Sequence, residues 1–77
     1  MADFTRQEFI KMINRLHPER QLYLAQCDLS GLNLEGVNLK GANLYKANLT
    51  KANLFQSYLG GAILTGANLE GVIGYNP

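Results

Sequence analysis

The residue types that most often carry chemistry are few in this chain, and they stand apart from one another. Among 77 residues there is one cysteine, Cys27, and one histidine, His17. A zinc site needs at least three protein ligands, and His17 has no second ligand at a suitable spacing. No carboxylate pair, Ser/His/Asp set or Cys/His set converges along the sequence. We therefore expect no enzyme, no metal site, no cofactor and no small-molecule substrate.

Three short patterns resemble other functional motifs, but none of them supports a binding or modification site. Gly36-x4-Gly41 has the glycine spacing of a phosphate-binding loop, but Ala42 stands where that loop needs a lysine. Lys46 and Lys51 could touch a phosphate backbone, although solvated surface lysines are far more common. Asn48-Leu49-Thr50 is a glycosylation sequon, which has meaning only in a secreted protein. We assign no site to any of them.

The charge balance also excludes several classes of partner. Residues 1–21 carry four basic and three acidic side chains, residues 22–77 carry three of each, and the formal net charge is +1. Neither part has the one-sided charge of a nucleic-acid or membrane binder. There is no apolar run of about 20 residues and no signal-peptide pattern at the N-terminus. The lone Cys27 cannot close an internal disulfide. These features predict a cytoplasmic protein that forms one domain over residues 1–77.

The dominant feature of the sequence is a strict repeat of five residues that begins at Leu22. Its third position is leucine ten times in succession. These residues are Leu24, Leu29, Leu34, Leu39, Leu44, Leu49, Leu54, Leu59, Leu64 and Leu69. A step of five spirals around an α-helix and alternates between the two faces of a flat strand. All ten leucines can share one interior only if the chain turns a corner in every pentapeptide and so winds into a coil.

The other positions of the repeat fit the same winding. The first position is small or apolar, and it lies on the same inward side as the leucine. The second is usually asparagine, and we expect these side chains to form ladders between coils. The fifth is glycine at six corners, as a type II turn with positive φ requires. Lys46, Lys51 and Gln56 interrupt that series, so we expect a different type of turn at those three corners.

These residues resemble the pentapeptide-repeat family, whose motif is A(D/N)Lxx. The pentapeptides ANLYK, ANLTK, ANLFQ and ANLEG meet that motif in full. The resemblance implies an all-β solenoid, a right-handed quadrilateral β-helix with 20 residues per coil. Over residues 22–76 this gives about two and a half coils, roughly 12 Å tall at ~4.8 Å per layer. A leucine-rich repeat, the nearest competitor, needs 20–29 residues per unit.

An amphipathic helix is predicted for residues 3–17. Thr5 is suited to be the N-cap and Glu8 completes a capping box, while Phe4 and Phe9 have the spacing of a hydrophobic staple. The proline after His17 ends the helix. Its apolar stripe consists of Phe9, Ile10, Ile13 and Leu16, with Met12 nearby.

We expect this helix to cap the N-terminal mouth of the coil. The first-position residues of the first coil, including Leu22 and Cys27, are larger than the alanines of the second coil, which indicates space for a cover. Cys27 should then be a small buried hydrophobe. At the other end Gly74 stands where an eleventh leucine belongs, and Pro77 discourages extension. That open edge favours contact with another copy of the protein or with sequence beyond it.

Stacking four-sided coils predicts where outward apolar side chains lie. They gather in the second and third coils: Tyr45, Phe55, Tyr58, Ile63, Ile73 and Tyr75. Phe55, Tyr58, Ile73 and Tyr75 form the expected centre. Exposed clusters of this kind mark contact sites, although aromatic stacking between layers would also account for them.

The leading hypothesis is therefore a non-catalytic structural or protein–protein interaction module, a rigid scaffold whose C-terminal half docks onto a protein partner or onto itself as a homodimer. The family resemblance implies an alternative, a DNA mimic that inhibits and protects type II topoisomerases. That role needs a long acidic rod, which the short and neutral repeat does not supply. A third possibility is the front end of a longer repeat protein.

Overall fold

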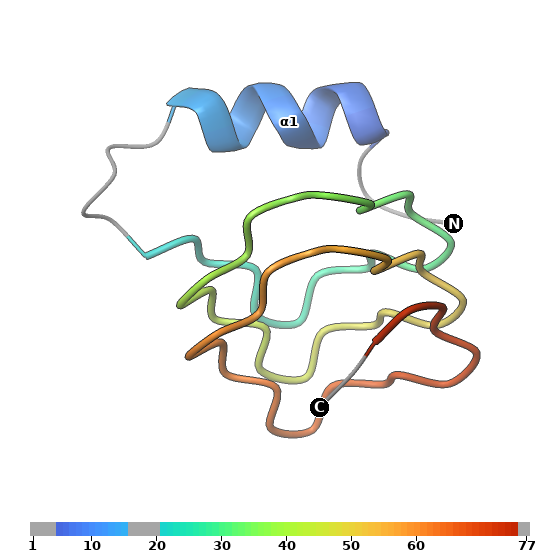
Figure 1. Ribbon diagram of the computed structural model, residues 1–77. Helices are drawn as coiled ribbons and strands as arrows, with labels where there is room; N and C mark the ends of the chain where they lie inside the picture. The colour runs from blue at the N-terminus through green and yellow to red at the C-terminus, as the bar shows by residue number, and fades with distance from the viewer. Residues whose placement is uncertain (1–4, 16–20, 76–77) are drawn as a thin grey trace.

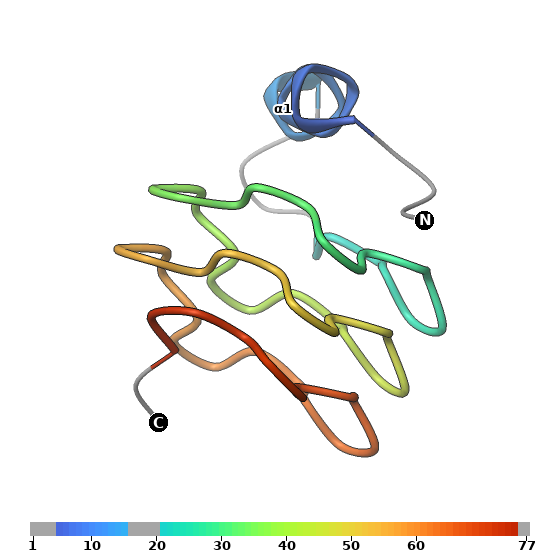
Figure 2. The ribbon, with the colours of Figure 1, turned by 90° about the vertical axis from the view of Figure 1, so that its right-hand side faces the viewer.

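The computed structural model describes residues 5–15 and 21–75. One α-helix, α1 (Arg6–Arg15), lies across the first of several stacked coils (Figure 1). Seen along the axis of α1, the coils form successive layers beneath it (Figure 2). The described residues contain turns and isolated bridges in place of long strands, because each pentapeptide is straight for only a few residues.

The register of the coils follows from seven parallel bridges between described residues. Every bridge joins residues 20 apart, so that one coil contains four pentapeptides, as the family resemblance implies. On the first side of the coil, for example, Tyr23 is bridged to Asn43 and Asn43 to Ile63. We number the four sides by the pentapeptides that form them. Side 1 contains residues 22–26, 42–46 and 62–66; side 2 contains 27–31, 47–51 and 67–71; side 3 contains 32–36, 52–56 and 72–75; side 4 contains 37–41 and 57–61.

Backbone hydrogen bonds join each coil to both of its neighbours. The second-position N–H donates to the preceding coil, as Asn43 does to the Leu22 oxygen at 2.8 Å. The third-position N–H donates to the following coil, as Leu44 does to the Ile63 oxygen at 2.8 Å. The fifth-position N–H also donates to the following coil. Each interior coil is therefore joined to both neighbouring coils by the same kinds of backbone hydrogen bond.

The leucine column fills the interior, as predicted. Seven members are at most 1% exposed: Leu24, Leu29, Leu34, Leu39, Leu44, Leu49 and Leu54. Leu59, Leu64 and Leu69 are only partly buried, because no further coil of described residues lies beneath them. The first position also faces inward, with Ala42, Ala47 and Ala52 fully buried and Cys27 half-buried.

The corners differ from the prediction. Lys46, Lys51 and Gln56 have φ between 55° and 61°, close to the 69–72° of the corner glycines, and Gln26 has φ 62°. Both kinds of corner are closed by a hydrogen bond from the first-position N–H to the preceding leucine oxygen. The expected change of turn type is therefore wrong at these positions. A left-handed residue with a side chain is disfavoured by about 1–2 kcal/mol, and the ladders and core on either side of the corner outweigh that strain.

The start of α1 matches the predicted capping box. The Thr5 hydroxyl accepts from the Glu8 N–H at 3.1 Å, and Glu8 Oε1 accepts from the Thr5 N–H at 2.8 Å. Thr5 is thus the cap and precedes the helix, so that the helix begins later than the predicted range of 3–17. Positions 3, 4, 16 and 17, including the Phe4 staple and the His17 stop, lie outside the described residues. Phe9 is fully buried in the same core as the first-coil leucines, and Ile10 and Met12 pack against it.

Candidate functional site: the C-terminal end face

The predicted outward residues do not form one patch. Tyr45 and Ile63 lie on side 1, whereas Phe55 and Ile73 lie on side 3, two corners away. Tyr58 lies on side 4, between those two sides. All five are exposed, from 37% for Tyr45 to 65% for Tyr58. These five residues thus lie in the second and third coils, as expected, but they are spread over three sides, because residues ten apart in this register belong to different sides.

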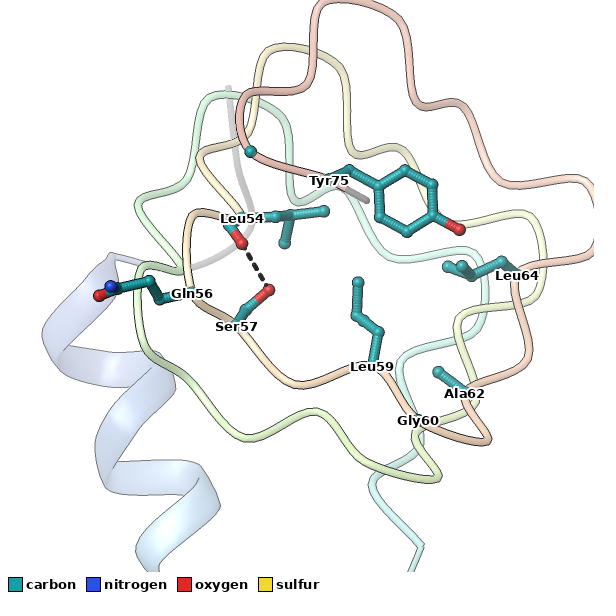
Figure 3. Close-up of a pocket in the computed structure, with 9 residues that line it drawn as sticks. Leu54, Gln56, Ser57, Leu59, Gly60, Ala62, Leu64 and Tyr75 are labelled. Atoms are coloured by element: carbon teal, nitrogen blue, oxygen red, sulfur yellow. Dashed lines mark hydrogen bonds between the residues drawn. The ribbon is translucent and has the colours of Figure 1, made fainter. Parts of the chain in front are cut away.

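Tyr75 is also placed differently from the prediction. Gly74 adopts a φ of 78° at the position of the missing leucine, and the chain turns there. A Cβ at Gly74 would lie 2.6 Å from the Phe55 Cα, so only glycine fits so close to the coil above. Tyr75 is half-buried against the core, and Figure 3 shows its ring pointing across the open interior toward Leu64. It therefore partly covers the interior of the coil and does not stack on Phe55.

The structure does bring Tyr58, Ile63 and Ile73 together in another way. All three belong to the last coil, residues 57–75, and stand around its lower rim on sides 4, 1 and 3. Within this rim lie the partly buried Leu59, Leu64 and Leu69. We call this lower surface of residues 57–75 the end face. Sequence reasoning did not select its floor, although the loss of a leucine at position 74 indicated where the interior would open.

A cavity of about 530 Å³ opens in the end face beneath side 4 (Figure 3). Its lining consists of Leu54, Gln56, Ser57, Leu59, Gly60, Ala62, Leu64, Gly74 and Tyr75. The cavity marks the place where the next coil would continue. Among the described residues, the last coil therefore ends at side 3, and only Gly74 and Tyr75 line the space below side 4.

The backbone at the end face has unused hydrogen-bonding groups. In the coil above, Leu39, Leu44 and Leu49 donate their N–H groups to the following coil. The equivalent N–H groups of Leu59, Leu64 and Leu69, and the equivalent oxygens of Ser57, Ala62 and Ala67, have no backbone partner among the described residues. Such an edge is a template for pairing with another chain.

The asparagines of the second position have a local role. In seven pentapeptides the Oδ1 of the second residue accepts the N–H of the fourth at 2.9–3.1 Å. Among the described residues, one hydrogen bond joins second-position side chains of adjacent coils: Asn53 Nδ2 donates to Asn33 Oδ1 at 3.5 Å. The expected ladders are thus largely wrong: these side chains cap the fourth-position N–H, which takes no part in the ladder between coils.

At four second positions a large apolar side chain stands in place of the asparagine or aspartate that accepts this hydrogen bond. They are Tyr23, Tyr58, Ile63 and Ile73, exposed by 71, 65, 41 and 59%. As a result, the N–H groups of Ala25, Gly60 and Thr65 have no backbone acceptor among the described residues. A typical intramolecular hydrogen bond contributes about 0.5–1.5 kcal/mol, and exposed side chains recover little by burial. Three of the four exceptions stand on the rim of the end face.

Charged groups are scarce at the end face. Glu70 is the one charged residue in 57–75. Lys46 lies in the second coil, with its Nζ 5.2 Å from the centre of the Tyr45 ring. The hydrogen bonds from the Thr5 N–H and hydroxyl lower the pKa of Glu8, and those from the Ser30 hydroxyl and N–H lower the pKa of Asp28. Both carboxylates serve local turns at the N-terminal end.

No three His, Cys, Asp or Glu side chains in residues 5–15 and 21–75 come close enough to hold a metal ion. Within the same part of the chain, no helix is both long and apolar enough to cross a membrane.

The four-pentapeptide coil defines the class of protein, a β-helical repeat protein. A family model described as pentapeptide repeats matches residues 21–54 and 52–76, so the chain belongs to the pentapeptide-repeat family, and its fold is a right-handed β-helix. Proteins of this family are generally non-catalytic. No curated protein matches the chain.

Solved structures of the family are similar to this chain over part of their length. A pentapeptide repeat protein from the cyanobacterium Cyanothece is 39% identical with a TM-score of 0.62, over 66% of this chain and 38% of its own. One from the thylakoid lumen of Arabidopsis thaliana is 30% identical with a TM-score of 0.42, over 78% of this chain and 48% of its own. The matches thus span less than half of either protein.

Proposed function

We propose that this protein is a non-catalytic interaction module that docks a protein partner through its end face. The observation that carries the proposal is the rim, where Tyr58, Ile63 and Ile73 replace the asparagine that the turn would otherwise use. The partly buried leucines of the floor add apolar area that a bound partner would cover. The low charge of residues 57–75 agrees with the depletion of charge at the centre of protein interfaces.

In this proposal the coil is a quadrilateral spool and α1 is its cap. The buried Phe9 lies over the first-coil core, and Arg6 Nη1 and Nη2 donate to the Asn33 and Glu35 oxygens at 2.7 and 2.9 Å. A solenoid needs such a cover at each exposed edge. Because α1 covers the first coil, the proposal places docking at the end face. The ladders hold the end face rigid, so little conformational entropy is lost on binding.

Affinity capture with matched variants tests this function. We expect the wild type to retain a specific protein from the native host, and Tyr58→Ser/Ile73→Ser to lose it. Tyr23→Ser is the control, because Tyr23 is at least as exposed but lies in the first coil. Equal capture by all three proteins would show that the end face is not the docking surface. Equal urea midpoints would establish that the variants are folded.

A further inference from the structure

We infer that sides 4 and 1 of the coil together form a second contact surface, which binds an acidic, extended segment of a partner protein. We call this surface the tyrosine wall. It consists of residues 22–26, 42–46 and 62–66 on side 1 and of residues 37–41 and 57–61 on side 4. The two sides are neighbours, because each side 4 leads around a corner into the next side 1. The wall runs along the coils and not across their end, so it shares only residues 57–66 with the end face.

The winding of the chain sorts the charges of the repeat by side. The tyrosine wall carries Lys40 and Lys46 and no carboxylate, which gives it a formal charge of +2. Sides 2 and 3 carry all three carboxylates of the repeat and one lysine, which gives them a formal charge of −2: Asp28, Glu35, Glu70 and Lys51. The neutral charge of the repeat as a whole therefore conceals a cationic wall. Interfaces join surfaces of opposite potential, so this wall favours a negatively charged partner.

Both lysines of the wall lie against a glycine of the following coil. A Cβ at Gly66 would come within 2.9 Å of Lys46 Cγ, so the stem of Lys46 occupies the space that a side chain there would need. Lys46 Nζ also lies 5.2 Å from the centre of the Tyr45 ring. Lys40 Cγ would lie 4.0 Å from a Cβ at Gly60. A stem that already rests on the surface loses less conformational entropy when its ammonium group binds a carboxylate.

The wall also contains the backbone N–H groups that lack a turn bond. On sides 2 and 3, a second-position Oδ1 accepts every fourth-position N–H within residues 27–71. The three fourth-position N–H groups without an acceptor among the described residues all lie on the wall: Ala25, Gly60 and Thr65. At Gly60 neither a positive φ nor crowding requires glycine. A carboxylate over Gly60 is thus open to both the Gly60 N–H and the Lys40 ammonium, and such charged hydrogen bonds are stronger than neutral ones.

Exposed tyrosines supply the apolar contact area of the wall. Tyr23, Tyr45 and Tyr58 all lie on it, whereas Tyr75, the fourth tyrosine of the chain, is half-buried. Tyr45 is next to Lys46 in the sequence, and Tyr58 is two residues from Gly60, so each expected carboxylate position has an aromatic ring nearby. Tyrosine is enriched at protein interfaces because it offers a large, rigid contact area with a polar tip.

A short peptide segment fits this wall better than a nucleic-acid strand does. Nucleic-acid binding depends on the neutralisation of many phosphates, and the wall offers two ammonium groups. An extended peptide places every second side chain on the same face, so glutamate and leucine at alternate positions would both meet the wall. The chain measures only 31 × 24 × 22 Å, so the contact is smaller than the ~1,200 Å² of standard complexes, and we expect a Kd in the high micromolar range.

Fluorescence anisotropy with a labelled peptide of Glu-Ser-Leu-Ser repeats tests the wall. We expect the wild type to bind this peptide, and to bind its Gln-Ser-Leu-Ser counterpart at least about tenfold more weakly. Lys46→Gln should weaken binding about fivefold, as for an exposed ion pair. Lys51→Gln is the matched control on side 2, because Lys51 is also a fifth-position residue with positive φ whose stem lies over a glycine, Gly71. Both variants remove one positive charge, so non-specific attraction would weaken equally in the two.

A second matched pair tests the aromatic contacts. Tyr45 and Phe55 are both exposed fourth-position aromatics of the second coil, on side 1 and side 3. Tyr45→Ser should weaken peptide binding at least about tenfold, and Phe55→Ser should leave it unchanged. Urea midpoints establish that each variant is folded.

Three results would overturn the acidic-peptide site. They are equal losses within either pair of variants, equal binding of the glutamate and glutamine peptides, and tighter binding of an oligo(dT) strand, which would assign the wall to nucleic acid. Tyr45 and Lys46 lie outside the end face, so these results are independent of the capture experiment on Tyr58→Ser/Ile73→Ser.

Discussion

Arg6 donates to the backbone oxygen of Asn33 at 2.7 Å, and the second nitrogen of its guanidinium donates to the Glu35 oxygen at 2.9 Å. One coil below, the Leu34 and Gly36 N–H groups bond the equivalent oxygens of Asn53 and Phe55 at 2.8 and 3.0 Å. The guanidinium therefore supplies the two donors that a preceding coil would have supplied. Its fixed fork matches their spacing, which a helix of unrelated geometry could not do through its backbone.

Replacement of Arg6 should consequently loosen the N-terminal end. We expect Arg6→Ala to lower the free energy of unfolding by about 1–3 kcal/mol, since hydrogen bonds from a charged donor are lost. Arg6→Lys should recover only part of this loss, because one ammonium cannot span both oxygens. Urea denaturation measures the difference, with the exposed Lys11→Ala as the matched control on the same helix. A loss no greater than that of Lys11→Ala would contradict the role of the fork.

The second-position asparagines lead to a prediction with opposite signs for stability and docking. Ile63→Asn should add the turn bond to the Thr65 N–H and stabilise the fold by about 0.5–1.5 kcal/mol, while it weakens binding at the end face. Asn48→Ala should have the reverse effect on stability, because the Thr50 N–H and hydroxyl both donate to Asn48 Oδ1. Urea midpoints measure both changes. A less stable Ile63→Asn would mean that Ile63 serves the fold and not a contact.

The corners offer a test of stored backbone strain. Gln26 has φ 62°, and its side chain is exposed. We expect Gln26→Gly to stabilise the protein by about 0.5–1 kcal/mol, the relief of a left-handed residue less the flexibility that glycine adds to the unfolded chain. The neighbouring Ala25→Gly, where φ is not positive, should destabilise. If both substitutions had the same sign, strain would not be the cause.

Much of the fold follows from the sequence because the leucine register leaves only one winding that buries every member. The helix start was equally predictable, since Thr5 and Glu8 interact within four residues. The corners at Lys46 and Lys51 were not, because a residue's local preference for negative φ is overridden by the coils above and below. The position of the Tyr75 side chain depends on the turn at Gly74. The location of the end face depends on where the stacking of described coils stops. Sequence patterns describe each pentapeptide, whereas the site arises from the interruption of their stacking.

The interior can be tested with one buried and one exposed substitution. Leu49→Asp places an unpaired carboxylate in the middle of the fully buried column and should unfold the protein. Thr65→Asp is the appropriate control, since Thr65 occupies an exposed fourth position. Thr50 is less suitable because its hydroxyl bonds Asn48 Oδ1, next to which a carboxylate would be repelled. Far-UV circular dichroism distinguishes the two variants, and a folded Leu49→Asp protein would be incompatible with the dry interior.

Acid stability should depend on Asp28. Hydrogen bonds from the Ser30 hydroxyl and N–H lower the pKa of Asp28 in the folded protein below its unfolded value near 3.9. A depressed folded pKa contributes stability that is present above the unfolded pKa and is lost as the pH falls through the folded value. Asp28→Asn keeps the acceptor, as the other pentapeptides do, and removes the titration. The urea midpoint of the variant should therefore fall less than that of the wild type between pH 5 and pH 2, and parallel curves would show that the Asp28 carboxylate does not couple to folding.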